Sequence, residues 1–277
     1  CICCHNACFT MARHEGSAND QDLMDALHMA RCALNPQTMQ SKKYRVIKAG
    51  RPKRIAVIGG GIGGMESALL LAARGHQVDL YEKSDQLGGV FLAAAAPSFK
   101  EKDRQLIDWY RRQIEQSPVT VHQNTEITDL NTLDAEEIVV ATGARPRRLP
   151  IPGVENAMEA TEYLEGKETG DRVVIVGGGL TGCEIAYDLL RKGKQPTIVE
   201  MKNDLIAVKG VCLANSSFLR ETFALRKIPV YLETSLQTIW PDSVTLQDKT
   251  GTSFDVPCDT VILSVGYMPN PLAPASR

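Results

Sequence analysis

The sequence lacks an apolar run long enough to cross a bilayer: its longest apolar stretches, 55–62 and 90–96, fall well short of the roughly 20 residues required. It also lacks an excess of positive charge, because 31 basic residues face 33 acidic ones and the formal net charge is −2. Only 14 of its 277 residues are prolines and 43% are hydrophobic, unlike disordered chains. We therefore expect no membrane span and no nucleic-acid partner, but a globular protein of about two domains.

The cysteines are few but unevenly distributed. Five of the eight lie within the first 32 residues, at Cys1, Cys3, Cys4, Cys8 and Cys32. A chain of this size needs no disulfide framework, so this cluster indicates a metal or redox centre in a reducing compartment. No signal-peptide pattern precedes it, which favours the cytoplasm. Because the chain starts on a cysteine, we expect it to be part of a longer protein.

The sequence contains an internal repeat. Residues 55–84 align without gaps on residues 173–202, at a constant offset of 118 positions. Each copy reads as a β-branched strand, a glycine turn, a helix and a second extended segment that ends in a glutamate. Such βαβ units predict an α/β fold with two Rossmann-like domains.

The glycines of each copy have the spacing of a dinucleotide-binding turn. The first copy reads Gly59-x-Gly61-x-x-Gly64 with Glu82 following, and the second has Gly177, Gly179, Gly182 and Glu200 at the same spacing. The first glycine allows a tight turn, the second admits a pyrophosphate and the third lets helix and strand pack closely. The glutamate can accept hydrogen bonds from a ribose diol. A plain glycine-rich turn is the alternative, and the duplication disfavours it.

Elsewhere the pattern predicts further elements around the repeats. A basic, proline-bounded linker covers 33–53. The expected helices are 99–116 and 216–227, and the expected strands are 137–142, 230–240, 243–247, 253–256 and 260–265.

Taken together, residues 54–270 resemble the two-dinucleotide-binding flavoprotein oxidoreductases. The resemblance includes Leu87-Gly88-Gly89 and the segments 141–146 and 265–270. It implies a glutathione-reductase-like arrangement, with an FAD domain at 54–150, an NAD(H) domain at 151–256 and a return to the FAD domain at 257–277. The resemblance assigns FAD contacts to Gly59, Gly61, Gly63, Gly64, Glu82, Lys83, Gly89, Thr142 and Gly143, and NADH contacts to Gly177, Gly179, Thr181, Gly182, Glu184 and Glu200.

The cysteine segment, 1–53 with its linker, resembles that of the NADH:flavin oxidoreductases, which include 2,4-dienoyl-CoA reductase, trimethylamine dehydrogenase and enoate reductases. This resemblance implies that Cys1, Cys4, Cys8 and Cys32 hold a 4Fe-4S cluster, since soft thiolates suit iron–sulfur centres. The assignment of Cys32 depends on Cys-x-x-Asn-Pro, because the segment after Cys8 is longer than in that family. A zinc site remains an alternative.

The resemblance also implies a function. NADH would reduce FAD by hydride transfer without a catalytic side chain, and electrons would pass through the cluster to FMN in a TIM barrel that precedes Cys1 in the family. The expected substrate is an α,β-unsaturated carbonyl compound, and the protein is expected to be a homo-oligomer. Glu200 favours NADH over NADPH, because a carboxylate repels a 2′-phosphate.

Two alternatives stay open at this point. One is an electron-feeding protein like the small subunit of glutamate synthase, which also sets cysteines before paired dinucleotide folds. The other is a non-catalytic scaffold that holds ADP at the first site. The barrel and the last FAD segment are expected to lie outside the chain, which looks cut at both ends.

Overall fold

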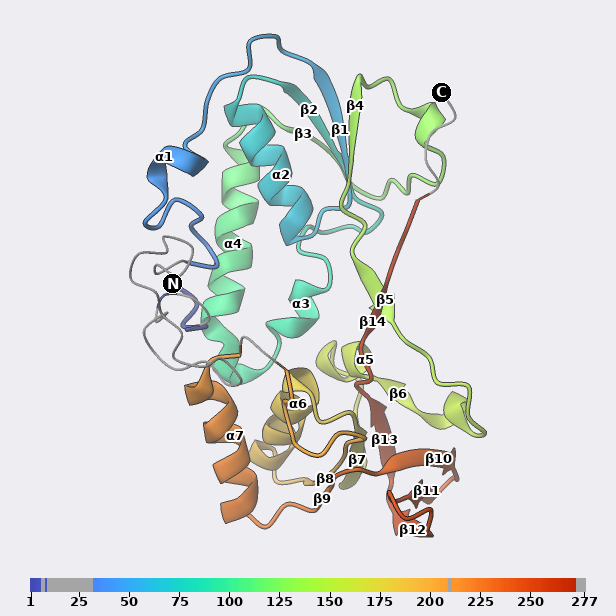
Figure 1. Ribbon diagram of the computed structural model, residues 1–277. Coiled ribbons are helices and arrows are strands. Elements are labelled where there is room, and N and C mark those ends of the chain that lie inside the picture. Colours follow the sequence, from blue (N-terminus) through green and yellow to red (C-terminus); the bar gives the residue numbers. More distant parts are fainter. Residues whose placement is uncertain (6–7, 9–31, 209–210, 273–277) are drawn as a thin grey trace. The chain divides into compact units, whose positions relative to one another are not determined.

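The computed structural model describes residues 1–5, 8, 32–208 and 211–272. The chain forms two compact units (Figure 1). The first unit comprises Tyr44–Arg145 and the described residues from Tyr267 onward. The second unit comprises Pro146–Gly266 and most of the described residues that precede Tyr44.

The first unit is built on a four-stranded parallel sheet with the strand order β3-β2-β1-β4. Helices α2 and α4 lie side by side along this sheet (Figure 1). The strands are β1 (Arg54–Ile58), β2 (Gln77–Tyr81), β3 (Thr120–His122) and β4 (Glu137–Val140), and the helices are α2 (Ile62–Ala73), α3 (Phe91–Ala94) and α4 (Glu101–Glu115). The short helix α1 (Ser41–Tyr44) precedes them, and only its last residue belongs to the first unit.

Burial in the first unit follows the apolar pattern of the sequence. All residues of β1 after Arg54 are buried, as expected for a central parallel strand that is covered on both faces. Helix α4 buries Ile107, Tyr110 and Ile114, which share one helical face, and exposes most of its charged residues. The amphipathic helix predicted over 99–116 is therefore confirmed.

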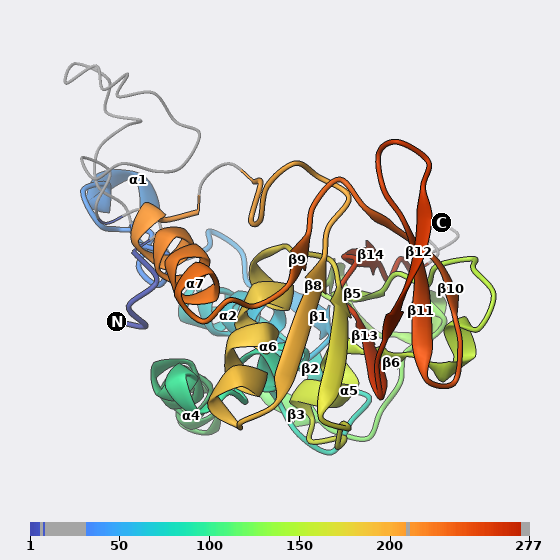
Figure 2. The same cartoon turned by 90° about the horizontal axis from the view of Figure 1, so that it is seen from below.

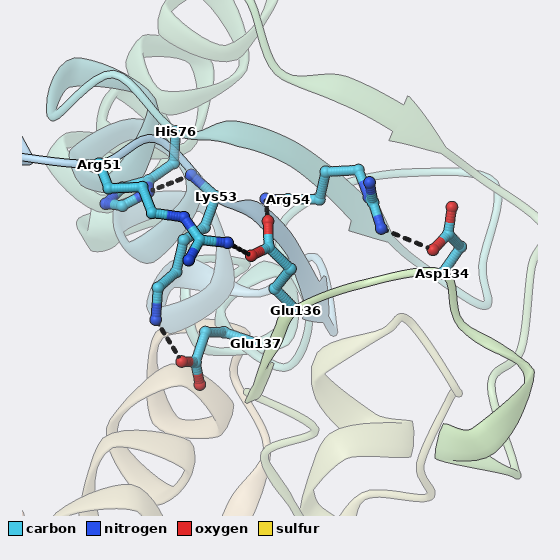
Figure 3. A network of polar contacts seen from close by, with 7 residues as sticks. All are labelled: Arg51, Lys53, Arg54, His76, Asp134, Glu136 and Glu137. Carbon is cyan, nitrogen blue, oxygen red and sulfur yellow. Dashed lines mark hydrogen bonds and ion pairs between the residues drawn. The ribbon is translucent and has the colours of Figure 1, made fainter.

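Ionic contacts fix the entry of β1 beside β4 (Figure 3). The Lys53 ammonium lies 2.6 Å from a carboxylate oxygen of Glu137, and the Arg54 guanidinium lies 2.9 Å from Asp134. Glu136 accepts the backbone N–H of Arg54 at 3.1 Å and pairs with Arg51. Exposed pairs contribute little stability each, so their main effect is to hold the register of the two strands.

The second unit has a five-stranded parallel sheet, ordered β6-β13-β7-β8-β9, and a separate antiparallel sheet, ordered β10-β11-β12 (Figure 2). The parallel strands are β6 (Met158–Glu159), β7 (Arg172–Val176), β8 (Gln195–Val199), β9 (Val230–Tyr231) and β13 (Thr260–Leu263). The antiparallel strands are β10 (Ser235–Ile239), β11 (Ser243–Gln247) and β12 (Ser253–Pro257), and the helices are α5 (Ala160–Leu164), α6 (Leu180–Arg191) and α7 (Leu213–Leu225).

The structure differs from the sequence predictions in three respects. The strand predicted over 230–240 is divided into β9 and β10, because Glu233 has a left-handed φ of 51° and the chain turns there. Strand β3 was not predicted at all. Strand β13 pairs with β7, so the second unit continues to Gly266, ten residues beyond the predicted boundary at 256. The chain returns to the first unit only at β14 (Tyr267–Pro269), which pairs with β5 (Ala144–Pro146).

In the part of the chain that the structure describes, no helix is both long and apolar enough to span a membrane. The longest is the charged helix α4, with 15 residues.

Candidate dinucleotide sites and cysteine segment

The turn between β1 and α2 depends on two glycines. Gly59 has a left-handed φ of 105°, and a Cβ on it would lie 2.4 Å from the carbonyl oxygen of Ala141. A Cβ on Gly64 would lie only 1.7 Å from the carbonyl oxygen of Gly59. Neither position has room for a side chain, because the end of β1 lies close to the residue after β4 at Gly59 and to helix α2 at Gly64.

Gly61 and Gly63 are less confined, and a Cβ on Gly61 would meet only the Gly89 Cα, at 3.9 Å. Gly61 is the extended N-cap of α2, and no described side chain caps the helix. A Cβ on Gly63 would meet no atom within 4 Å. A helix N-terminus without a capping side chain is the arrangement that binds phosphate groups through its first N–H groups.

Glu82, at the carboxyl end of β2, is held by the same turn. The residue is only 7% exposed, and its Oε2 accepts the backbone N–H of Gly60 at 2.6 Å. Its Oε1 accepts the backbone N–H and the hydroxyl of Ser84, at 2.8 and 2.7 Å. A carboxylate can accept about four hydrogen bonds, so Glu82 retains capacity for a ribose hydroxyl in a fixed orientation.

The second site repeats this arrangement. Gly177 has a φ of 108°, and a Cβ on it would lie 2.3 Å from the Ser264 carbonyl oxygen. A Cβ on Gly182 would lie 1.9 Å from the carbonyl oxygen of Gly177, while one on Gly179 would meet nothing within 4 Å. The repeat found in the sequence is therefore also a repeat of close backbone contacts.

Glu200 occupies in the second site the place of Glu82 in the first. Its Oε2 accepts the Gly178 N–H at 2.6 Å, and its Oε1 accepts the Lys202 N–H at 2.8 Å. The Lys202 ammonium donates to the carbonyl oxygen of Ala207. Each site thus presents a fixed carboxylate beside a glycine turn.

The repeat extends past the segment recognised in the sequence. A Cβ on Gly60 would lie 2.5 Å from Leu87, and one on Gly178 would lie 2.6 Å from Leu205, again 118 positions further on. The residue after each leucine also makes the same contact. The N–H of Gly88 donates to the carbonyl oxygen of Gly60, and the N–H of Ile206 donates to that of Gly178. Sequence comparison missed this part, because the leucine alone is a weak signal.

A residue that the sequence did not indicate holds the Leu87-Gly88-Gly89 loop. The Arg111 guanidinium on α4 donates to the Leu87 carbonyl oxygen through Nε at 2.9 Å and through Nη2 at 2.5 Å. Gly89 in turn packs against Gly61, since a Cβ on it would lie 3.0 Å from the Gly61 Cα. Arg111 therefore fixes a loop that borders the first glycine turn.

The segments 141–146 and 265–270 are joined by hydrogen bonds. The Thr142 hydroxyl donates to the carbonyl oxygen of Asn270 at 2.5 Å, and the Asn270 N–H donates to the Gly143 carbonyl oxygen at 3.0 Å. The Thr142 hydroxyl is thus used in a contact within the protein. Gly143 has a left-handed φ of 67°.

Three further predicted cofactor residues lie close to the turns. Lys83 is exposed directly after Glu82, and Thr181 is exposed as the second residue of α6. Glu184 lies beyond the first turn of α6, four residues after Leu180, rather than at the helix start.

The predicted cluster ligands Cys1, Cys4, Cys8 and Cys32 are exposed or half-buried thiols. Two of them accept backbone hydrogen bonds on sulfur: Cys1 from the N–H of Cys3 at 3.3 Å, and Cys32 from the N–H of Leu34 at 3.4 Å. Among the described residues, no three His, Cys, Asp or Glu side chains are gathered in a group that could hold a metal ion.

Cys3 is exposed, whereas Cys183, Cys212 and Cys258 are buried in the second unit. Burial raises the pKa of Cys183 to about 12 and that of Cys258 to about 11. Cys212, the N-cap of α7, is also buried. A high thiol pKa suppresses reactivity, so Cys183 and Cys258 serve packing.

Fold and site together define a protein with two dinucleotide-binding α/β units. The profile of the pyridine nucleotide-disulphide oxidoreductases matches residues 53–276, and the chain belongs to this family. The match confirms the predicted fold class. The chain is accordingly an FAD- and NAD(P)-binding oxidoreductase domain.

Individual relatives give a consistent picture. The chain is 36% identical over 241 residues to a cinnamate reductase of Clostridium sporogenes and 33% identical over 249 residues to an NADH oxidase of Thermoanaerobacter brockii. These alignments cover 86% of the chain but only 36% and 38% of the relatives. A solved 2-naphthoyl-CoA reductase complex superimposes with a TM-score of 0.79 at 27% identity, over 86% of this chain and 37% of the other. The chain therefore spans little more than a third of these proteins.

Proposed function

We propose that the chain is the electron-input part of an NADH:flavin oxidoreductase, with FAD in the first unit and NADH in the second. The observation that carries this proposal is the duplicated carboxylate: Glu82 and Glu200 each accept a glycine N–H at 2.6 Å beside a helix N-terminus. One such site accommodates one dinucleotide. Two such sites in one protein of this family accommodate a hydride donor and a hydride acceptor.

The residues of the chain bind and orient the two dinucleotides. Open backbone at Gly61 and Gly179 leaves room for a pyrophosphate, and the buried or half-buried glutamates fix the ribose ends. When bound, FAD supplies the hydride acceptor and NADH the hydride. No side-chain acid or base is needed for this chemistry, so the protein contributes orientation and exclusion of competing reactions.

The nicotinamide dinucleotide in this proposal is NADH. The Glu200 carboxylate is fixed by two backbone N–H groups and cannot turn away from a 2′-phosphate. The Lys202 ammonium, the cation nearest in sequence, is already bonded to the Ala207 carbonyl oxygen. A 2′-phosphate would therefore meet a fixed negative charge.

A 4Fe-4S cluster would be held by Cys1, Cys4, Cys8 and Cys32. The donor set fits this group, since these are thiols outside the buried core and two of their sulfurs already accept backbone N–H groups. The cluster would carry single electrons to FMN in a TIM barrel outside this chain. The names of two relatives, cinnamate reductase and 2-naphthoyl-CoA reductase, support an unsaturated carbonyl compound as the substrate of the whole protein.

Absorption spectroscopy of anaerobically purified protein tests the proposal. We expect flavin bands on a broad iron–sulfur shoulder, and bleaching of both on addition of NADH. A matched addition of NADPH should bleach the spectrum much more slowly. A colourless protein that contains stoichiometric zinc would contradict the proposal, and a flavin spectrum without iron would limit it to the two dinucleotide sites.

A further inference from the structure

The cysteine segment is bound to a helix of the second unit. The side-chain Nδ2 of Asn215, in the first turn of α7, donates to the carbonyl oxygen of Cys4 at 3.4 Å. The two residues are 211 positions apart, and the contact is partly buried. Cys4 also belongs to the same compact unit as Pro146–Gly266.

The helix that carries Asn215 is held in place by backbone hydrogen bonds and by packing. The carbonyl oxygen of Cys212, the buried N-cap of α7, accepts the N–H groups of Asn215 and Ser216 at 3.1 and 3.2 Å. One and two turns further along α7, Leu219 and Phe223 are buried in the core of the second unit. The amide of Asn215 is therefore presented from a helix whose position the core fixes.

The backbone around Cys4 has an unusual conformation. Cys3 and His5, on either side of Cys4, have left-handed φ values of 56° and 53°. Residues with a side chain rarely adopt this conformation, and it persists where the surroundings hold it. Cys3 also donates its N–H to the sulfur of Cys1, so the same short segment fixes two of the predicted ligands.

We propose that Asn215 is a positioning residue that fixes the cysteine segment, and with it a cluster ligand, to the second unit. The inference rests on the proposed function for the cluster itself, but the attachment of the segment stands on the contact alone. A cluster placed in this way would remain in one position relative to the dinucleotide site of the same unit. Electron transfer from that unit would then not require a prior ordering of the cysteine segment.

The substitution Asn215→Asp isolates this contact. It keeps the size of the side chain but replaces the amide donor by a carboxylate, which repels the Cys4 carbonyl oxygen. A carboxylate in the first turn favours a helix, so α7 itself is not weakened. The matched control is Ser217→Asp, which adds the same charge two residues further on, and Asn215→Gln should restore part of the effect by keeping a donor.

Two readouts are measured on the full chain purified without oxygen. Hydrogen exchange of residues 1–5 should become about fivefold faster in Asn215→Asp, the factor expected for one lost hydrogen bond. Release of iron to a chelator should accelerate by a similar factor. Flavin content should match the wild type in all three variants, which verifies that they are folded.

Unchanged hydrogen exchange in Asn215→Asp would overturn the inference, as would an equal acceleration in Ser217→Asp. If the wild type binds no iron while the difference in exchange persists, the positioning of the segment is upheld. That result would contradict only the cluster in the proposed function.

Discussion

Glu82 and Glu200, 118 positions apart, bind equivalent backbone groups. Each carboxylate accepts a glycine N–H at 2.6 Å and, at 2.8 Å, the N–H of the residue two positions after the glutamate. The two sites thus share one design. Their functional difference must come from the cofactor each admits, and the glutamates offer a way to test them separately.

The substitution Glu200→Gln should relax the choice of nicotinamide dinucleotide. It removes the negative charge and one acceptor while leaving the size of the side chain. We expect kcat/KM for NADH to fall about tenfold and the NADPH to NADH ratio of kcat/KM to rise by at least that factor. Glu82→Gln is the matched control, which should lower flavin retention without moving the ratio. An unchanged ratio in Glu200→Gln would contradict the role of this charge.

Arg111 should matter for flavin retention although it belongs to no recognised motif. Removal of its guanidinium in Arg111→Ala frees the Leu87 carbonyl oxygen and the loop beside the first glycine turn. A hydrogen bond from a charged donor contributes about 1.5–3 kcal/mol, so we expect the Kd for FAD to rise about tenfold. The neighbouring Arg112 is exposed, and Arg112→Ala should leave the Kd unchanged in a fluorescence titration. Equal affinities in the two variants would refute this role.

The two kinds of glycine in the first turn should respond differently to a methyl group. Gly64→Ala places its Cβ 1.7 Å from the Gly59 carbonyl oxygen, so the first unit should not fold. Gly63→Ala meets no atom within 4 Å and gains about 1 kcal/mol of helix propensity. Thermal unfolding followed by circular dichroism should show loss of the unfolding transition of the first unit for Gly64→Ala. For Gly63→Ala it should show a Tm no lower than that of the wild type. A folded Gly64→Ala protein would show that the contact can relax.

The ion pair of Arg172 and Asp259 should give the second unit an acid-dependent stability. A hydrogen bond from the Arg172 side chain, 2.6 Å from the carboxylate, lowers the pKa of Asp259 to about 2. Because this value lies below the roughly 3.9 of an unfolded chain, the pair stabilises the folded state above about pH 4. That contribution is lost as the pH falls from about 4 towards 2.

Urea unfolding at several pH values measures this effect. Asp259→Asn should lower the midpoint at neutral pH and flatten its dependence between about pH 4 and 2. Asp85 is exposed, and Asp85→Asn should keep the wild-type dependence. If the Asp259→Asn curve remains parallel to that of the wild type across this range, the pair does not contribute as described.

Much of the fold and of the two sites could be predicted because the information is local. The strand, the glycine turn, the helix and the glutamate of each site lie within 30 consecutive residues, and their order specifies a βαβ unit. Glycine at positions 64 and 182 is required by contacts within the same turn, whereas Gly59 and Gly177 meet the distant residues Ala141 and Ser264. The cysteines likewise marked their segment by density alone.

Only the tertiary structure decided how distant residues meet. Arg111 reaches Leu87 across 24 positions and Asn215 reaches Cys4 across 211, and neither residue belongs to a periodic pattern. Strand β13 pairs with β7, which lies some 90 residues earlier in the chain, so no local pattern indicates that it belongs to the second sheet. Composition and spacing report which segments are strands, helices and turns, whereas partners are selected by packing in three dimensions. The sequence alone therefore determined the duplicated turns and their glutamates, and folding determined the side chains that hold the loops around them.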